Sequence, residues 1–265
     1  MSKRLTIDLE NLRISYRVQG SGCPILLLHG GWMTGKLTWS KHYKRLAEDF
    51  LVISPDMRGH GYTNNPSGAF SSYRSLAWDM IEFVNALGLG QKPVVMGHSA
   101  GAVISLYMSI YQPNILARQV LSGVSPFLGT SEKFIRGTRA YFGTINPNTP
   151  PGKWAFMARH PVLCAKLRAV HHTSDWYDLL TALWPLRWSA LKLDPSDYKK
   201  ITCPTLVVNG SEDAYSTIGH ACALTDMIPG AHFIAVPGQG HMFPIQKPEL
   251  LHAHALPFLL SAGDL

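Results

Sequence analysis

The sequence predicts an α/β protein built on a mostly parallel, twisted sheet of about eight strands with helices on both faces. Short apolar runs alternate with helical stretches along most of the 265 residues, and such alternation calls for right-handed crossovers between parallel strands. A chain of this length can also bury one large core. One internal segment, residues 125–200, contains no convincing strand. We therefore expect a helical insertion after the sixth strand.

The first half of the chain supplies the edge and the centre of the predicted sheet. Residues 4–10 and 12–18 alternate apolar and polar side chains, which predicts a hairpin of two half-exposed strands. Residues 24–29 form a continuous apolar run, the pattern of a strand buried on both faces. The elements expected next are a helical stretch over 36–49, a strand over 50–55, a helix from Ser71 or Ser72 to Gly88, a strand over 93–97, a helix from Ser99 to about Gln112 and a strand over 118–122.

The second half contains the insertion and the last strands. We expect a strand over 205–209, a helix over about 214–227, a strand over 233–236 and a final helix over 248–260. This pattern divides the chain into a core of residues 1–124 and 201–265 and a helical insertion of residues 125–200. Four of the seven tryptophans lie in the insertion. Such an aromatic-rich insertion can roof a pocket, although each tryptophan alone can equally pack the insertion onto the core.

Composition argues against several classes of protein. The chain is 46% hydrophobic and 15% charged, as in globular proteins. No apolar run approaches the length of a membrane span or forms a signal peptide, so we expect a cytoplasmic protein without stable membrane insertion. The net charge is +7, and the insertion holds eleven Lys and Arg against five Asp and Glu. Without a basic run or a known motif, this charge does not predict a nucleic-acid partner.

Residues 97–101, Gly-His-Ser-Ala-Gly, lie between a predicted strand and a predicted helix, the setting of a nucleophile elbow. Small residues allow a strand and a helix to close around a strained serine. The amide of Ala100 would then face an oxygen that becomes negative during attack by Ser99. By itself the motif is weak, because chance produces it in roughly one chain of this length in ten, and a serine at this position also often caps a helix.

A serine nucleophile needs a base, and the base needs an acceptor that fixes its tautomer. His241 lies in a Gly-rich loop past the final predicted strand, and Asp213 lies in the loop past the preceding strand. Reacting groups gather at these carboxyl ends of parallel strands. Serine, acid and histidine thus occur in the order Ser99, Asp213, His241, each after a different strand, which is the order expected for α/β-hydrolases.

The chain resembles the α/β-hydrolase superfamily over nearly its whole length. The matching motifs are His29-Gly30-Gly31-Trp32, residues 56–61, the elbow at 97–101, residues 210–213 and Gly240-His241. The resemblance implies the α/β-hydrolase fold and identifies the insertion with the cap that shapes the substrate pocket. It also implies that the amide of Gly31, or alternatively of Trp32, joins Ala100 in the oxyanion hole. Thr63 stands where the family usually has serine.

Other candidate residues have structural interpretations. Glu212 is an alternative triad acid, but the family pattern favours Asp213. Asp56 and His60 belong to a loop motif that is mostly structural in the family. We expect His98 and Trp32 to line the substrate pocket, although Trp32 can equally cover the sheet. No metal or other cofactor is predicted, because no matching Cys or carboxylate set accompanies His171-His172 or His252-x-His254.

The expected activity is cofactor-independent hydrolysis of a small or medium carboxylic ester or lactone through an acyl-enzyme. Carbon–carbon bond hydrolysis with the same triad and a receptor without turnover are alternatives. An N-terminal peptidase is less favoured, because Trp32 stands where proline iminopeptidases usually have proline and a basic insertion suits a substrate ammonium group poorly. The expected partner is therefore a small-molecule substrate, and the sequence carries no signal for oligomeric state.

Overall fold

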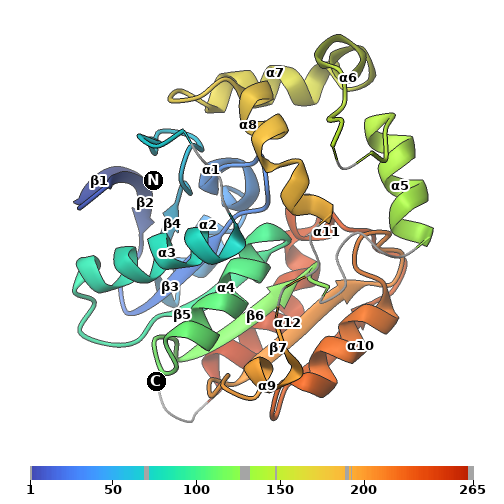
Figure 1. The fold of residues 1–265 in the computed structure, drawn as a ribbon. Helices are drawn as coiled ribbons and strands as arrows, with labels where there is room; N and C mark the ends of the chain where they lie inside the picture. Colours follow the sequence, from blue (N-terminus) through green and yellow to red (C-terminus); the bar gives the residue numbers. More distant parts are fainter. Residues whose placement is uncertain are drawn as a thin grey trace.

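The structure is a computed structural model that describes residues 2–68, 72–125, 132–146, 148–188, 191 and 193–261. Its described strands form one eight-stranded sheet in the order β1-β2-β4-β3-β5-β6-β7-β8. The predicted fold class is confirmed (Figure 1). The strands are β1 (Lys3–Leu9), β2 (Leu12–Gln19), β3 (Cys23–Leu28), β4 (Phe50–Pro55), β5 (Val94–His98), β6 (Arg118–Ser122), β7 (Thr205–Gly210) and β8 (His232–Val236).

The sheet is antiparallel at one edge and parallel elsewhere. The β1–β2 hairpin pairs Ile7 with Ile14, and β2 continues antiparallel onto β4. Each later neighbour is parallel, because a helical crossover separates the paired strands. The carboxyl ends of β5, β6, β7 and β8 therefore lie along one edge of the sheet, where four loops can bring functional side chains together.

Two apolar clusters cover the two faces of the sheet, as expected for an α/β fold. One cluster contains side chains of α3 (Tyr73–Leu87), α4 (Ala100–Tyr111) and α10 (Ile218–Met227). The other contains Trp39 of α1 (Gly35–Trp39), Tyr43 of α2 (Tyr43–Leu46) and side chains of α12 (Pro248–Leu260). The helices are thus held by burial of apolar side chains on both sides of the parallel strands.

Local hydrogen bonds set the helix boundaries. Ser72 caps α3 by accepting from the amide of Ser75, and Gly88 ends that helix in the left-handed conformation. Ser71, the other expected start, lies outside the described residues. The prediction of a helical stretch over about 36–49 was wrong in its extent, because the structure has two short helices there, α1 and α2. The chain turns between them, where the amide of His42 donates to the carbonyl of Trp39.

The segment between β6 and β7 is helical wherever the structure describes regular elements in it. Figure 1 shows α5, α6, α7 and α8 lying beyond the carboxyl ends of the central strands. Phe142, Phe156, Trp176 and Trp184 pack together in a separate apolar cluster of this segment. The elements are α5 (Glu132–Phe142), α6 (Lys153–Arg159), α7 (Pro161–Val170), α8 (Trp176–Leu183), the 3₁₀ helix η1 (Pro185–Trp188) and α9 (Pro195–Tyr198).

The division of the chain into a core and a cap of residues 125–200 stays a proposal. The separate cluster around Trp176 supports it, whereas Leu191 and Tyr198 pack into the cluster under α4. Residues 126–131, where the insertion is expected to begin, lie outside the described residues. Within the described part of the chain, every helix is too short or too polar to cross a membrane.

Candidate active site

Ser99 occupies a strained turn between β5 and α4. Its φ is 53° and its ψ is −116°, a conformation that costs a non-glycine residue energy unless its surroundings impose it. Its amide donates to the carbonyl of Ser122 at the end of β6 over 2.8 Å. A Cβ at Gly97 would lie 2.7 Å from the Ala102 backbone, and one at Gly101 would collide with the carbonyl oxygen of Leu28. The two glycines therefore permit the close approach that holds the turn.

Asp213 and His241 meet beside this turn. Nδ1 of His241 donates to Oδ2 of Asp213 over 2.8 Å, and only 1% of Asp213 is exposed. Oδ1 of Asp213 accepts from the amides of Tyr215 at 2.7 Å and Ser216 at 2.9 Å. Burial alone would raise the pKa of Asp213, but the facing His241 and these hydrogen bonds outweigh it and hold the pKa below its ordinary value. The helix expected over about 214–227 begins at Ile218, where the side chain of Thr217 caps it by accepting from the amide of His220.

Gly123 and Asn209 support this pair, and the sequence analysis missed both. Gly123 has a φ of +66°, and a Cβ there would lie 2.8 Å from Cε1 of His241. Its amide donates to Oδ1 of buried Asn209 over 2.9 Å, and Nδ2 of Asn209 donates to the carbonyl of Ser216. Asn209 thereby joins the loop after β6 to the loop that holds Asp213. Their positions at the carboxyl ends of β6 and β7 are the signal that could have identified them.

The loop after β3 brings its glycines to the elbow. A Cβ at Gly30 would lie 3.6 Å from Cβ of Ser99, and one at Gly31 would lie 3.9 Å from Cβ of Ala100. Trp32 follows with a φ of 61°, and its ring packs edge-on against Phe142 at 5.3 Å between centroids. Both residues expected to supply oxyanion donors, Gly31 and Ala100, therefore lie next to each other.

His98 stands directly before Ser99 and is buried beside His241. The centroids of the His98 and His241 rings are 4.9 Å apart. Burial lowers the pKa of His98 to about 3, and the neighbouring His241 contributes to this lowering. His98 is thus held neutral beside the ring of His241.

A cavity of about 460 Å³ opens over Ser99. Ser99, His98, Trp32 and His241 line it, and the rest of its described wall is mainly aromatic and aliphatic. Glu212 is the charged residue in this described wall, which contains no Lys or Arg. Much of the apolar wall comes from the helices between β6 and β7, namely Phe134, Tyr141, Phe142, Phe156, Leu163, Leu167, Leu180 and Leu183. The volume is in the range that holds a small organic ligand.

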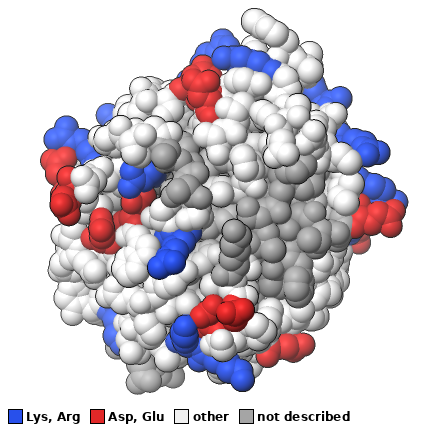
Figure 2. Space-filling view, in the orientation of Figure 1, with Lys and Arg blue, Asp and Glu red and all other residues white. Residues whose placement is uncertain are grey.

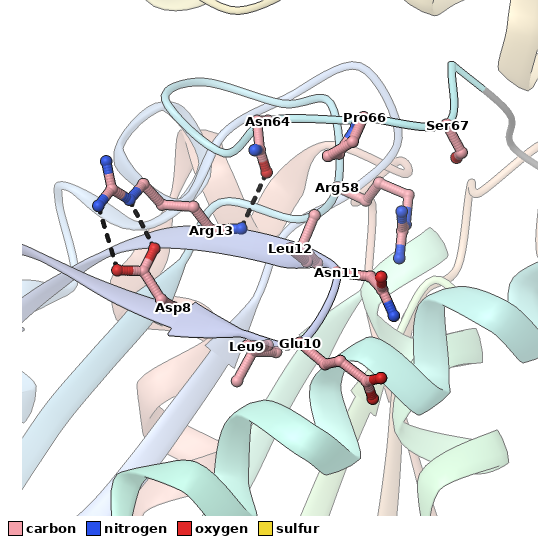
Figure 3. Close-up of a pocket in the computed structure, with 10 residues that line it drawn as sticks. All are labelled: Asp8, Leu9, Glu10, Asn11, Leu12, Arg13, Arg58, Asn64, Pro66 and Ser67. Atoms are coloured by element: carbon pink, nitrogen blue, oxygen red, sulfur yellow. Dashed lines mark hydrogen bonds and ion pairs between the residues drawn. The ribbon is translucent and has the colours of Figure 1, made fainter.

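A second hollow, of about 720 Å³, lies at the turn of the β1–β2 hairpin (Figure 3). Its cations already have carboxylate partners: Arg13 binds Asp8 at 2.6 Å, and Arg58 binds Asp79 at 2.6 Å. This hollow is open and lies at the sheet edge formed by β1, away from Ser99. The cavity over Ser99 is therefore the candidate active site.

The loop motif at residues 56–61 is held by its own hydrogen bonds. Asp56 accepts from the amides of Gly35 and Tyr62, and burial raises its pKa to about 6. Nδ1 of His60 donates to the carbonyl of Arg58. Thr63 donates its hydroxyl to the carbonyl of Asp56 and accepts from the amide of Ser15, so it preserves local hydrogen bonding as expected.

His171 and His252, each from one of the two histidine pairs of the sequence, make hydrogen bonds in different parts of the structure. His171 bonds to two core loops, and His252 Nε2 lies 2.9 Å from Nδ1 of His42. Within the described part of the chain, no group of three or more His, Cys, Asp or Glu side chains is placed to hold a metal ion.

A strained serine on a strand–helix turn and a hydrogen-bonded Asp–His pair on the loops after β7 and β8 define a protein of the hydrolase class with the α/β-hydrolase fold. A sequence model of the alpha/beta hydrolase family matches residues 25–254, and the chain belongs to this family. It is a hydrolase whose described residues include the side chains expected for that chemistry.

The proteins similar to this chain include hydrolases with different names. The 2-hydroxy-6-oxo-6-(2'-aminophenyl)hexa-2,4-dienoic acid hydrolase of Metapseudomonas resinovorans is 25% identical over 98% of this chain and 91% of that relative. A meta-cleavage product hydrolase from Pseudomonas fluorescens has a TM-score of 0.80 with 20% identity, covering 98% of both chains. A thermophilic esterase from Thermogutta terrifontis has a TM-score of 0.73 with 24% identity, covering 97% of this chain and 98% of that one. The two structural likenesses show the fold.

Proposed function

We propose that this protein hydrolyses a neutral carboxylic ester or lactone of small to medium size through an acyl-enzyme, without a cofactor. The observation on which the proposal rests is the 2.8 Å bond between His241 and buried Asp213, because His241 and the strained Ser99 line the same largely apolar cavity. Aspartate at Nδ1 leaves Nε2 of His241 as the proton acceptor. Ser99, Asp213 and His241 are thus the proposed catalytic residues.

In the proposed reaction, Oγ of Ser99 attacks the carbonyl carbon while Nε2 of His241 takes the hydroxyl proton. The amides of Gly31 and Ala100 stabilise the resulting oxyanion. The carbon–oxygen bond to the alcohol breaks, and His241 gives its proton to the departing oxygen. His241 then removes a proton from water, which attacks the acyl carbon, and the acid product leaves as Ser99 recovers its proton.

The composition of the cavity wall favours a neutral, apolar acyl group. Trp32 and His98 line the cavity together with aromatic and aliphatic side chains, and such walls gain free energy by covering apolar ligand surface. A free carboxylate buried there would need a paired cation, and the described wall offers no Lys or Arg. We therefore favour esters and lactones over diacids or keto acids.

Carbon–carbon bond hydrolysis is the second candidate, because a relative named for a hexadienoic acid hydrolase matches nearly the whole chain. The same Ser99 and His241 would serve that reaction. Rates measured side by side on aryl esters of increasing acyl length, on lactones and on a vinylogous diketone acid separate the two candidates. A faster rate on the diketone acid than on every ester would overturn the ester proposal.

The proposal also includes a small-molecule substrate as the partner and the cytoplasm as the location. On the face shown in Figure 2, Lys and Arg side chains are separated by neutral residues and by Asp and Glu, without one continuous basic surface among the residues described there. This distribution supports a small-molecule substrate rather than a nucleic acid as partner. Cys23, Cys164, Cys203 and Cys222 are free thiols, which fits the reducing cytoplasm that we propose as the location.

The decisive variant is Ser99→Ala, with Ser67→Ala as its control on an exposed serine of the distant hollow. We expect Ser99→Ala to lose ester turnover by about 10³-fold or more and to keep its fold by circular dichroism, while Ser67→Ala matches the wild type. Full activity in Ser99→Ala refutes the proposed nucleophile. A single burst of about one product per chain without a steady rate indicates the receptor alternative.

A further inference from the structure

The segment of residues 171–173, between α7 and α8, is hydrogen-bonded to two loops of the core. The amide of His172 donates to the carbonyl of Gly61 over 2.8 Å, and the hydroxyl of Thr173 donates to the carbonyl of Thr63 over 2.7 Å. The ring of His171 reaches further, because it bonds both to Gly61 and to Trp32. His171 therefore joins the helical insertion to the loop that follows β3.

The two ring nitrogens of His171 have different roles. The amide of Gly61 can only donate, so Nδ1 of His171 accepts this bond, over 3.0 Å, and carries no proton. Nε2 consequently carries the proton and donates to the carbonyl of Trp32 over 2.9 Å. His171 is only 7% exposed, and burial lowers its pKa, which favours this neutral form. A purely apolar side chain of similar size could make neither bond.

Trp32 is the residue where this contact matters for chemistry. Its φ of 61° is left-handed, an unfavourable conformation for a bulky side chain that surrounding contacts must maintain. It directly follows Gly31, which lies next to Ala100. The bond from His171 fixes the carbonyl of the peptide that follows Trp32, and the amide of that same peptide donates to the carbonyl of Gly30 over 3.3 Å. The Gly30 carbonyl belongs to the peptide that carries the N–H of Gly31, so these two bonds link His171 to the orientation of that donor.

We propose that His171 is a positioning residue for the oxyanion hole, because its hydrogen bond to Trp32 holds the loop that supplies the second amide donor. The inference rests on the proposed function. It means that docking of the insertion and alignment of the catalytic amides are coupled through one side chain. An oxyanion donor acts only when its N–H points at the position where charge develops, and a displacement of about 1 Å can cost about 100-fold in rate.

His171→Leu tests the proposal, with His171→Gln as the conservative variant and His172→Leu as the matched control. His172 contributes its main chain to the contact with Gly61, while its exposed ring stacks on Tyr62. A glutamine side chain can both accept and donate. The readouts are kcat and KM on an ester, the melting temperature, and the Ki of an alkyl boronic acid, which forms a tetrahedral adduct with Ser99 that places an oxyanion in the hole.

We expect His171→Leu to lower kcat by about 10- to 100-fold and to raise the boronate Ki by a similar factor, with KM changed by less than about 3-fold. His171→Gln should recover most of both losses, and His172→Leu should match the wild type. A folded His171→Leu variant with unchanged kcat overturns the inference, as does a loss of kcat with unchanged boronate Ki.

If His171→Leu does not fold, His171→Gln and His171→Asn decide, because they differ in reach. A graded loss of kcat and of boronate affinity from Gln to Asn supports the inference, and wild-type values in both variants overturn it. If the wild-type protein neither hydrolyses esters nor binds the boronate, the proposed function is overturned and this inference with it. If the wild-type protein is active and the His171 variants have the same kcat and boronate Ki, the inference alone is overturned.

Discussion

Asp213 uses its two carboxylate oxygens for different partners, with Oδ2 accepting from Nδ1 of His241 at 2.8 Å and Oδ1 accepting from the amides of Tyr215 and Ser216. Three donors thus fix the carboxylate, and the carboxylate fixes the imidazole in the tautomer with Nε2 unprotonated. The orientation of the proposed base is therefore set by the backbone of the loop after β7.

The substitution Asp213→Asn should remove this orientation while keeping a side chain of the same shape. The introduced carboxamide would favour the other His241 tautomer, with the proton on Nε2, so we expect kcat to fall by about 10³- to 10⁴-fold. Glu212→Gln is the control, because Glu212 is exposed and next in sequence. Steady-state kinetics on an ester checks both. A large loss in Glu212→Gln with an active Asp213→Asn variant would assign the acid to Glu212.

The substitutions Gly123→Ala and Gly230→Ala should distinguish the effect of a strained backbone on stability from the effect of a contact with His241 on kcat. Gly123 and Gly230 have the same φ of +66°, but a Cβ at Gly123 would lie 2.8 Å from Cε1 of His241, whereas a Cβ at Gly230 meets nothing within 4 Å. Each substitution should lower the free energy of unfolding by about 1–2 kcal/mol through its left-handed backbone. Only Gly123→Ala should also displace His241 and lower kcat by at least about 10-fold.

Urea denaturation and kinetics on the two variants check this prediction. Equal kcat values in Gly123→Ala and Gly230→Ala would show that the site absorbs the added methyl group and that the close approach at Gly123 has no role in placing His241.

The sequence was sufficient to predict the strands and the order of the candidate triad, because both depend on local patterns. Buried strands are continuous apolar runs, and the loops after β5, β7 and β8 meet at one edge once the strands are parallel. Glycine has no side chain that a catalytic motif could match, so no local pattern in the loop after β6 points to Gly123. Its role follows from the position of His241, which is distant in sequence.

Hydrogen bonds between distant segments explain the remaining differences. The stretch over 36–49 has helical periodicity, but it is split where the chain turns at His42, whose ring bonds to the carbonyl of Pro244. His171 and His172 looked like a weak metal motif, whereas the ring of His171 instead bonds Gly61 and Trp32. Such partners are set by tertiary packing, which periodicity does not encode.

Buried neutral histidines should make the fold sensitive to mild acid. Burial lowers the pKa of His29 to about 4 and those of His42 and His98 to about 3, with His252 and His241 adding to the effect on His42 and His98 respectively. In the unfolded chain these groups take up protons below about pH 6.5. Above about pH 6.5 these histidines are neutral in both states and do not lower the free energy of unfolding. As the pH falls from about 6.5 toward their pKa values in the folded protein, the free energy of unfolding decreases by about 1.4 kcal/mol per histidine per pH unit.

Asp56 acts in the opposite direction. Burial raises its pKa to about 6 in the folded state, so between about pH 4 and 6 the folded state holds more protons at this group than the unfolded state does. Between about pH 4 and 6, Asp56 should thus offset the decrease in the free energy of unfolding that about one histidine causes. The histidines outnumber it, and we expect the free energy of unfolding to decrease from about pH 6.5 to about 5.

Urea denaturation at about pH 7.5, 6.5, 5.5 and 5.0 measures this dependence, and His42→Gln isolates one contribution. Glutamine does not titrate, so this variant should have a slope smaller by up to about 1.4 kcal/mol per pH unit below about pH 6.5. His232→Gln is the control, because His232 is exposed on β8 and should leave the slope unchanged. Identical slopes in the wild type and His42→Gln would show that His42 is already a charged imidazolium in the folded protein. That result would contradict its burial and its hydrogen bonds, in which Nε2 donates to the carbonyl of Pro244 and Nδ1 accepts from His252.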